Sequence, residues 1–288
     1  MLVFKTSSIS DNPNLETLKR DQLLSGDNTG VRFLFDSAFG FSYAGGAPAN
    51  GVKVGDVAEH ADGSFVLSSG QAVAYNGNGF DLSTLTGITG YTSQAHVLAP
   101  GGVWSGIAAA QQFIVCAYLR LPAEVDWNTE SSILTFFASS LSGNGYGAVA
   151  DPLTIGFRAA AKSISFRRQT AVGAQIELTC VPDGHYGKLA QVAFWRNAAG
   201  TGARIKSAGG LTQAVGVAGA LNVADIAACQ PRFGNSIPFN SANLTGHRAG
   251  RKYRLFRGFV ENLAVSGRDP VAVLDADYAR TIARGVFS

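Results

Sequence analysis

Short apolar runs divided by Gly, Asn, Asp and Ser fill the chain from residue 31 onward, and they constrain its fold more than any other feature. Each run has the length of a β-strand and suitable turn residues around it. The runs occupy residues 31–35, 64–67, 72–75, 113–121, 133–138, 153–158, 163–167, 175–180, 189–196, 203–207, 231–234 and 253–265. A single open sheet of so many strands would expose too much apolar surface. The pattern therefore predicts an all-β fold, a two-sheet antiparallel sandwich.

The last third of the chain carries the clearest strand pattern. Residues 191–197 (QVAFWRN), 231–236 (PRFGNS) and 253–267 (YRLFRGFVENLAVSG) read as successive strands. Within the third, Phe259, Leu263 and Val265 share one apolar side, on which Arg257 and Glu261 are exceptions. This alternation favours a half-buried strand over a helix.

Composition agrees with many short strands joined by tight turns. The chain has 288 residues, of which 46% are hydrophobic, 15% are charged and 35 are Gly. Asn76-Gly77, Asp62-Gly63 and Asp183-Gly184 are suited to hairpin turns. With no internal repeat or clear linker, we predict one large domain over residues 31–288.

Residues 1–30 lack the short apolar runs of the rest of the chain and are predicted to form an N-terminal arm. Residues 7–28 are polar and show only a weak helical pattern, which predicts at most one short helix that starts near Asn12 or Asn14 and ends at Gly26. An arm of this kind either latches onto a neighbouring subunit or is a disordered tail, and the sequence leaves both open.

Two further short helices and one loop are expected. Residues 221–229 suit a short helix, and residues 271–283 follow Pro270 as an amphipathic one. The apolar positions at helical spacing in the latter are Val273, Leu274, Tyr278 and Ile282. The glycine-rich passage 84–110 is expected to be a loop insertion.

The cysteines and the first residues bear on the cellular compartment. Cys116, Cys180 and Cys229 are odd in number and far apart, which argues against a disulfide framework or a structural zinc site. Cys116 and Cys180 lie in apolar runs and are expected as small core residues, in a protein made in a reducing compartment. The sequence contains neither a hydrophobic signal core after Met1 nor an apolar stretch of membrane-spanning length.

Charge gives no strong partner signal except at one place. The formal net charge is +3, with Lys and Arg spread along the chain, so no nucleic-acid or membrane partner is expected. Residues 247–257 concentrate basic residues, among them Arg248, Arg251, Lys252 and Arg254. They form either a solvated loop followed by an exposed strand face, or a docking patch for an acidic partner or an anionic sugar.

The order of the last strands, ending in Trp-Arg-Asn, then Arg-Phe-Gly-Asn, then Ser-Gly-Arg, resembles the laminin-G-like and concanavalin A-like lectin and glucanase jelly rolls over residues 31–288. The segment 251–280 with the preceding PRFGNS is most similar to the lectin-type jelly rolls in structural proteins of tailed bacteriophages. The resemblance implies a jelly roll with a decoration, tail or fibre role.

One motif is similar to the E-x-D-x-x-E signature of laminarinase-type glycoside hydrolases, in which Glu124 would be the nucleophile, Asp126 a helper and Glu130 the acid/base. Here the spacing is one residue longer. If the segment is extended, the Cα atoms of Glu124 and Glu130 lie about 20 Å apart, whereas a retaining pair needs its carboxyls about 5–5.5 Å apart. We expect a polar connection between strands and no catalytic residue.

Other chemistry-bearing residues are scattered. His60, His96, His185 and His247 sit in four different polar segments and are expected to be solvated. Calcium is the commonest cofactor of the resembled family, but no D-x-D-x-D-G series occurs, and we predict no metal site and no cofactor.

Aromatic side chains raise the question of sugar binding. Trp104, Trp127 and Tyr146 lie in loop-like surroundings and are the candidates for stacking on a sugar ring. Trp195 lies in a strand and is expected in the core.

These observations lead to three hypotheses. The first is a non-enzymatic structural component of a bacteriophage virion, such as a capsid decoration, tail or fibre module, made in the host cytoplasm and held to other virion proteins and to copies of itself. The second is a carbohydrate-binding receptor module for a host glycan. The third is a glycoside hydrolase that uses Glu124 and Glu130.

Overall fold

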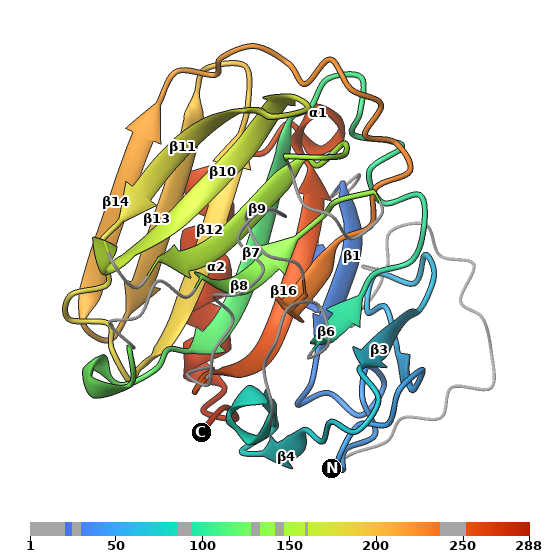
Figure 1. Ribbon diagram of the computed structural model, residues 1–288, viewed down its shortest axis with the longest axis vertical. Coiled ribbons are helices and arrows are strands. Elements are labelled where there is room, and N and C mark those ends of the chain that lie inside the picture. Colours follow the sequence, from blue (N-terminus) through green and yellow to red (C-terminus); the bar gives the residue numbers. More distant parts are fainter. Residues whose placement is uncertain are drawn as a thin grey trace, which may run out of the picture.

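The structure is a computed structural model that describes residues 21–24, 30–85, 94–127, 133–141, 147–158, 161–236 and 252–288. Its strands form two antiparallel sheets stacked face to face, as Figure 1 shows. The all-β sandwich predicted from the sequence is thereby confirmed.

Sheet A forms the rear layer in Figure 1. In spatial order its strands are β14 (Gly210–Gly216), β13 (Thr201–Ser207), β12 (Leu189–Arg196), β7 (Phe113–Arg120), β16 (Arg254–Asn262), β5 (Gly79–Asp81) and β4 (Ala74–Asn76), while β1 (Val31–Asp36) pairs with β16 beside β5.

Sheet B forms the front layer. In spatial order its strands are β11 (Ala174–Cys180), β10 (Ser163–Ala171), β9 (Leu153–Arg158), β8 (Ile133–Ala138), β15 (Arg232–Asn235), β6 (Ala95–Leu98), β3 (Gly63–Leu67) and β2 (Lys53–Val54).

Aromatic side chains from both sheets fill the space between them. Phe35 of β1 meets Phe233 of β15 edge-on, with ring centroids 5.2 Å apart. The Gly258 backbone lies so close to these rings that a Cβ atom added there would be only 2.6 Å from Phe233. Cys116 and Cys180 are buried as expected, Cys116 on the outer side of sheet A.

Helix α2 (Pro270–Ala283) covers the outer face of sheet A (Figure 1). Asp269 caps its N-terminus by accepting a hydrogen bond from Ala272 N–H, and Pro270 occupies the first turn. The predicted C-terminal helix is confirmed, although Ile282 is exposed. Leu23 and Leu24 of the short 3-10 helix η1 (Gln22–Leu24) are buried in the same apolar layer as Leu274.

Several expectations about single elements need correction. The passage 84–110 contains the buried strand β6, and residues 221–229 form turns and bends instead of a helix. The strand at 253–265 ends at Asn262, whose side chain caps the short helix α1 (Leu263–Ser266). This strand, β16, is buried on both faces and not on one, because α2 covers the side that carries Phe259. Of the predicted arm, only residues 21–24 and 30 lie within the described part.

The turn at Asn76-Gly77 is confirmed as a hairpin between β4 and β5. Gly77 and Asn78 both have positive φ, of 54° and 62°, as a two-residue type I′ turn requires. In the described part of the chain, no helix combines the length and apolar character needed to cross a membrane.

Candidate functional site

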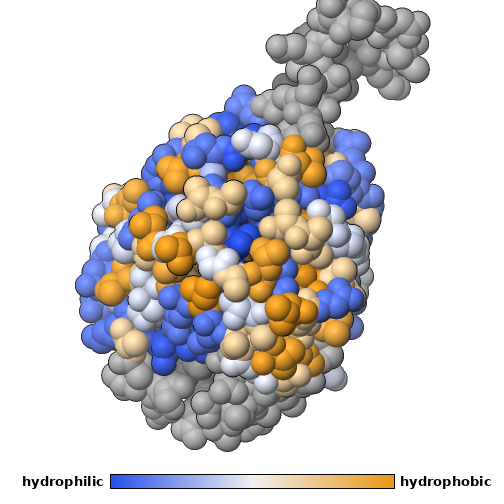
Figure 2. All heavy atoms as spheres, turned by 90° about the horizontal axis from the view of Figure 1, so that it is seen from above, coloured by the Kyte–Doolittle hydropathy of each residue, from blue (hydrophilic) through white to orange (hydrophobic). Residues whose placement is uncertain are grey.

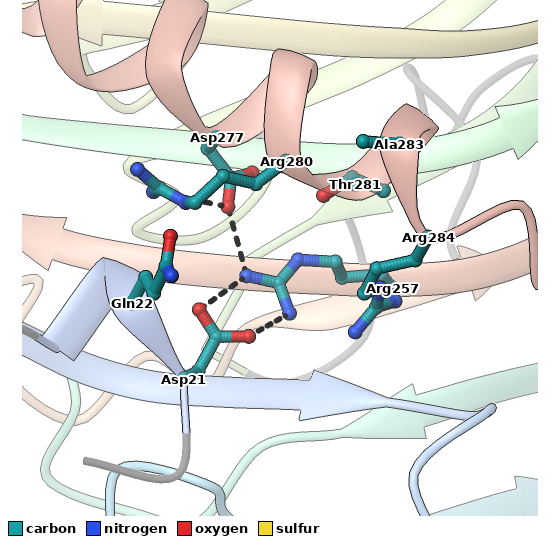
Figure 3. Close-up of a pocket in the computed structure, with 8 residues that line it drawn as sticks. All are labelled: Asp21, Gln22, Arg257, Asp277, Arg280, Thr281, Ala283 and Arg284. Atoms are coloured by element: carbon teal, nitrogen blue, oxygen red, sulfur yellow. Dashed lines mark hydrogen bonds and ion pairs between the residues drawn. The ribbon is translucent and has the colours of Figure 1, made fainter. Parts of the chain in front are cut away.

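An ion-pair cluster centred on Arg257 lies between sheet A and α2 (Figure 3). The Nη1 of Arg257 is 2.8 Å from Asp21 Oδ2 and 3.0 Å from Asp36 Oδ2, and its Nη2 is 2.9 Å from Asp277 Oδ1. Four elements meet here, since Arg257 comes from β16, Asp36 from β1, Asp277 from α2, and Asp21 from the residue before η1. One interpretation of the basic run 247–257 puts its strand residues on an exposed face, which is wrong for Arg257: its side chain is 1% exposed.

The charges of the cluster stabilise one another. Burial by itself would raise the pKa of Asp21, but the charge and hydrogen bonds of Arg257 hold that pKa below its ordinary value. Burial opposes ionisation of Arg257 as well, yet the nearby carboxylates of Asp277, Asp21 and Asp36 raise its pKa well above the usual range. Arg257 and Asp21 are therefore both charged at neutral pH.

A pocket of about 420 Å³ opens beside this cluster, and Figure 3 shows Arg280 and Arg284 of the C-terminal segment at its wall. Arg284 Nη2 is 2.7 Å from Asp36 Oδ2, and Arg280 Nη2 is 3.9 Å from Asp277 Oδ1. Three guanidiniums thus face three carboxylates. A balanced set of this kind holds the segment at Asp21 against the sheet and the C-terminal helix, and gives no excess charge to attract an ionic ligand.

A hydrogen-bonded chain extends the cluster under α2. Tyr118 OH donates to Asp277 Oδ2 over 2.7 Å, and Gln191 Nε2 donates to Tyr118 OH over 2.8 Å. Arg204 Nη1 then bonds Asp275 Oδ1 over 2.9 Å. Burial raises the pKa of Tyr118 well above its usual range, so the phenol remains a donor. The polar residues on this face of sheet A serve to seat α2.

The free edge of sheet A presents a different kind of surface. Its outermost strand, β14, exposes Leu211, Gln213 and Val215, with Leu211 at 53% and Val215 at 68% exposure. Within the part of the chain that the structure describes, β14 pairs with β13 alone. No charged residue occurs in the sequence between Lys206 and Asp225.

Exposed apolar side chains continue beyond β14. We call the β14 strip the set Leu211, Val215, Val217, Leu221 and Val223. Val217 is 78% exposed and Val223 is 83% exposed. The end of the sandwich that follows β14 is seen face-on in Figure 2, where apolar side chains gather between polar ones. Uncharged surface with grouped apolar side chains is typical of a protein contact.

Two of the three aromatic candidates for sugar stacking, Trp104 and Trp127, do not lie at the surface. Trp104 is 0% exposed and packs edge-on against Phe113 with centroids 5.0 Å apart, and Trp127 is 7% exposed with its Nε1 donating to Pro122 O over 3.2 Å. Neither offers a ring face to a ligand, which corrects the expectation for both. Tyr146 lies outside the described residues. Trp195 of β12 is in the core, as predicted.

The basic run at 247–257 is only partly described, because Arg248 and Arg251 lie outside the described residues. Lys252 forms an ion pair with Asp126, and Arg254 pairs with Asp81 and also donates to Ser288 O. Both side chains therefore have acidic or carbonyl partners within the chain, and the docking patch stays a prediction.

The structure describes only the first part of the motif that is similar to the glycoside hydrolase signature. Glu124 and Asp126 lie in the 3-10 turn η4 (Glu124–Asp126) directly after β7, while Glu130 lies outside the described residues. Asp126 is engaged by Lys252. The described part of the connection between β7 and β8 contains the polar residues Glu124 and Asp126, as the sequence predicts.

Two of the four histidines correct the expectation of solvated loops. His96 is buried in β6, where burial and the nearby Arg232 lower its pKa to about 3. His185 is buried with Nδ1 2.7 Å from Ser207 Oγ and Nε2 3.0 Å from Thr212 Oγ1. His60 is exposed as expected, and His247 is not described. Among the described residues no three His, Cys, Asp or Glu side chains gather as a metal site would require.

Sequence reasoning missed both the carboxylates around Arg257 and the β14 edge. Arg257 and Glu261 interrupt an apolar strand, and this signal could have pointed to buried partners; Glu261 bonds Arg268 over 2.7 Å. The signal for β14 was the uncharged stretch after Lys206, in which Leu211 and Val215 alternate with small or polar residues.

Comparisons with known proteins find likeness in structure alone. No protein-family model matches the sequence, and no curated protein matches it. Among solved structures, the binding domain of Paraclostridial Mosquitocidal Protein 1 aligns over 82% of this chain and 49% of its own, with 11% identity and a TM-score of 0.48. This chain thus spans about half the length of that one.

Two further solved structures align with lower TM-scores. The carbohydrate-binding module CBM40 of a Ruminococcus gnavus sialidase, bound to α2,3-sialyllactose, aligns over 74% of this chain and 95% of its own, with 12% identity and a TM-score of 0.43. The enzymatically active domain of tailspike protein 2 of bacteriophage CBA120 aligns over 61% and 25%, with 13% identity and a TM-score of 0.37.

Proposed function

We propose that this chain is a non-enzymatic structural module of a larger particle, of the kind that tailed-bacteriophage virions contain, and that it acts through protein–protein contacts. The observation that carries the proposal is the β14 strip. Its strand pairs with β13 alone among the described residues, its Leu and Val side chains are exposed, and the sequence carries no charge from residue 207 to residue 224. Contact with a partner would remove this apolar surface from water. Each Å² of apolar surface buried in this way stabilises the complex by about 25 cal/mol.

The Arg257 cluster, between α2 and a central strand of sheet A, supports the same role. It fixes Asp21 and the buried Leu23 to the sheet and to α2, so the N-terminal segment is joined to the sandwich at this point. In a particle, residues 1–20 would provide a second contact, with copies of this chain or with other virion proteins.

Sedimentation of particles from the native source tests the proposal. The wild-type chain should sediment with the particles, and a triple variant with Leu211→Ser, Val215→Ser and Val217→Ser should remain with free protein while keeping its β-sheet circular dichroism. Val265→Ser, at a 46% exposed valine in α1, is the matched control and should still be incorporated. Wild-type chain that sediments as free protein, or a triple variant incorporated normally, would contradict the proposal.

Carbohydrate binding is a second candidate, because one polar row on sheet B suits it. Glu177 of β11 lies 3.3 Å from Arg158 Nη1 and 3.2 Å from Arg167 Nε, and it accepts a hydrogen bond from Ser165. Guanidiniums held in this way are effective donors to sugar hydroxyls and carboxylates. Arg158 is 42% exposed and is the residue to test.

A glycan array with purified protein separates the two candidates. Binding that is lost in Arg158→Ala and retained in Lys53→Ala would favour carbohydrate recognition. An array without binding would remove this candidate and leave the first one intact.

A further inference from the structure

The strands at the two ends of each sheet's strand order differ in how they resist pairing with another strand. β2 has two residues and β4 has three, and β11 carries the ion-paired Glu177. Short strands and charged side chains are the usual protection of a sheet edge. β14 has seven residues, none of them charged and none of them Pro, and lacks this protection.

The backbone of β14 offers hydrogen-bonding groups in a regular row. Ser207 and Gly210 pair across a two-residue loop, so they form a hydrogen-bonded pair, and the even-numbered residues of β14 direct their N–H and C=O groups toward β13. The N–H and C=O groups of Leu211, Gln213 and Val215 consequently face away from the sheet. These same residues expose their side chains.

We propose that this edge pairs with the same edge of a second copy, antiparallel and about a two-fold axis at Gln213, which makes sheet A continuous across a dimer. This deepens the proposed function and rests on it. Gln213 would then lie opposite the partner's Gln213, and Leu211 opposite the partner's Val215. Each of these pairs exchanges two backbone hydrogen bonds, because all three residues direct their groups outward.

The sequence of the edge is self-complementary in this register. The order apolar, polar, apolar at Leu211, Gln213 and Val215 reads the same in both directions, which an isologous interface requires. Residues near a two-fold axis meet their own copies, so a charge at this place would repel itself. The absence of charge between Lys206 and Asp225 thus suits a second copy better than a charged partner strand.

Sedimentation equilibrium of the purified full chain tests the proposal. Wild type should dimerise reversibly. Gln213→Lys and Gln213→Glu should each weaken the dimer by up to about fivefold, since like charges would face each other at the axis, where a cross-strand pair changes the free energy of association by up to about 1 kcal/mol. An equimolar mixture of the two variants should restore association as a heterodimer. Val265→Lys is the control and should dimerise like wild type.

The outcomes separate this proposal from the one on which it rests. A wild-type chain that stays monomeric at every concentration, or a mixture that associates no better than either variant alone, overturns the two-fold pairing. If particle incorporation still depends on Leu211, Val215 and Val217 in that case, the structural role stands with another occupant of the edge. If incorporation is also insensitive to those residues, both proposals fail.

Discussion

The guanidinium of Arg257 and the carboxylate of Asp277 lie 2.9 Å apart, and each side chain is 1% exposed. This contact joins a central strand of sheet A to the C-terminal helix. Asp21 and Asp36 complete the coordination of the same guanidinium, so that one cation holds three separate parts of the chain together.

Removing that cation should be costly. In Arg257→Met, the buried carboxylates of Asp36 and Asp277 would lose the cation that they share, and the free energy of unfolding should fall by about 3–5 kcal/mol. Urea titration measures the change. The control is Lys53→Met, because Lys53 pairs with Asp62 at the surface with side chains 68% and 41% exposed, and its loss should cost about 0–1 kcal/mol. Equal losses in the two variants would show that the cluster does not hold the fold together.

The N-terminal segment should contribute to stability through Leu23. This side chain is 0% exposed in the apolar layer between α2 and sheet A, so Leu23→Ala should lower the free energy of unfolding by about 2–5 kcal/mol. Gln22→Ala changes the neighbouring, exposed position and should shift the free energy by about 0.5 kcal/mol or less. Thermal unfolding of the two variants gives the comparison. If Leu23→Ala unfolds at the wild-type temperature, residues 21–24 are not docked in solution.

Gly202 should tolerate no side chain. It lies opposite Trp195 in the ladder of β12 and β13, and a Cβ at Gly202 would be 2.0 Å from the indole ring. Gly202→Ala must displace Trp195 and should destabilise the protein by about 1–3 kcal/mol, with a change in tryptophan fluorescence. At Gly40 an added Cβ has no atom within 4 Å, so Gly40→Ala serves as the control. Unaltered fluorescence and stability in Gly202→Ala would contradict the packing of the indole over this glycine.

Stability should fall as pH rises through the titration of Asp151. Burial raises the pKa of Asp151 to about 6 from 3.8 in the unfolded chain, so the folded state binds this proton more tightly. The stabilisation is complete below pH 3.8 and is lost between there and about pH 6, a change of about 3 kcal/mol. Asp21 acts in the opposite sense: its pKa is lowered, so its contribution is present above pH 3.8 and is lost as pH falls below that value.

The variant Asp151→Asn isolates the effect, because it cannot titrate. Relative to this variant, wild type should lose stability from pH 4 to pH 6 in urea titrations made at pH steps. If the stability of the two proteins changes with pH in parallel, the prediction is wrong, and Asp151 lies in a better solvated site.

The fold was more predictable from the sequence than the functional surface. Strands such as β8, β9 and β12 were predicted at their observed bounds, since alternation and Gly or Pro boundaries are local signals. β14 was missed because Gly, Ala and Gln give it little strand propensity, and it is stabilised by pairing with β13.

The burial of individual side chains was the property that the local sequence could not predict. Trp104 and Trp127 lie in irregular segments, and nothing in those segments reveals that Phe113 or Tyr186 packs against them. The partners of Arg257 are distant in sequence, as Asp21 is 236 positions away. Contacts of this range depend on the register of the whole sandwich.

Amide hydrogen exchange along β14 tests the central claim, that this edge is where the chain meets a partner, most directly. In the isolated monomer, the outward N–H groups of Leu211, Gln213 and Val215 should exchange quickly, while those of Thr212 and Ala214, bonded to β13, exchange slowly. In the assembled protein the first three amides should become protected and the other two should change little. Fast exchange of Leu211, Gln213 and Val215 in the assembled protein would contradict the account.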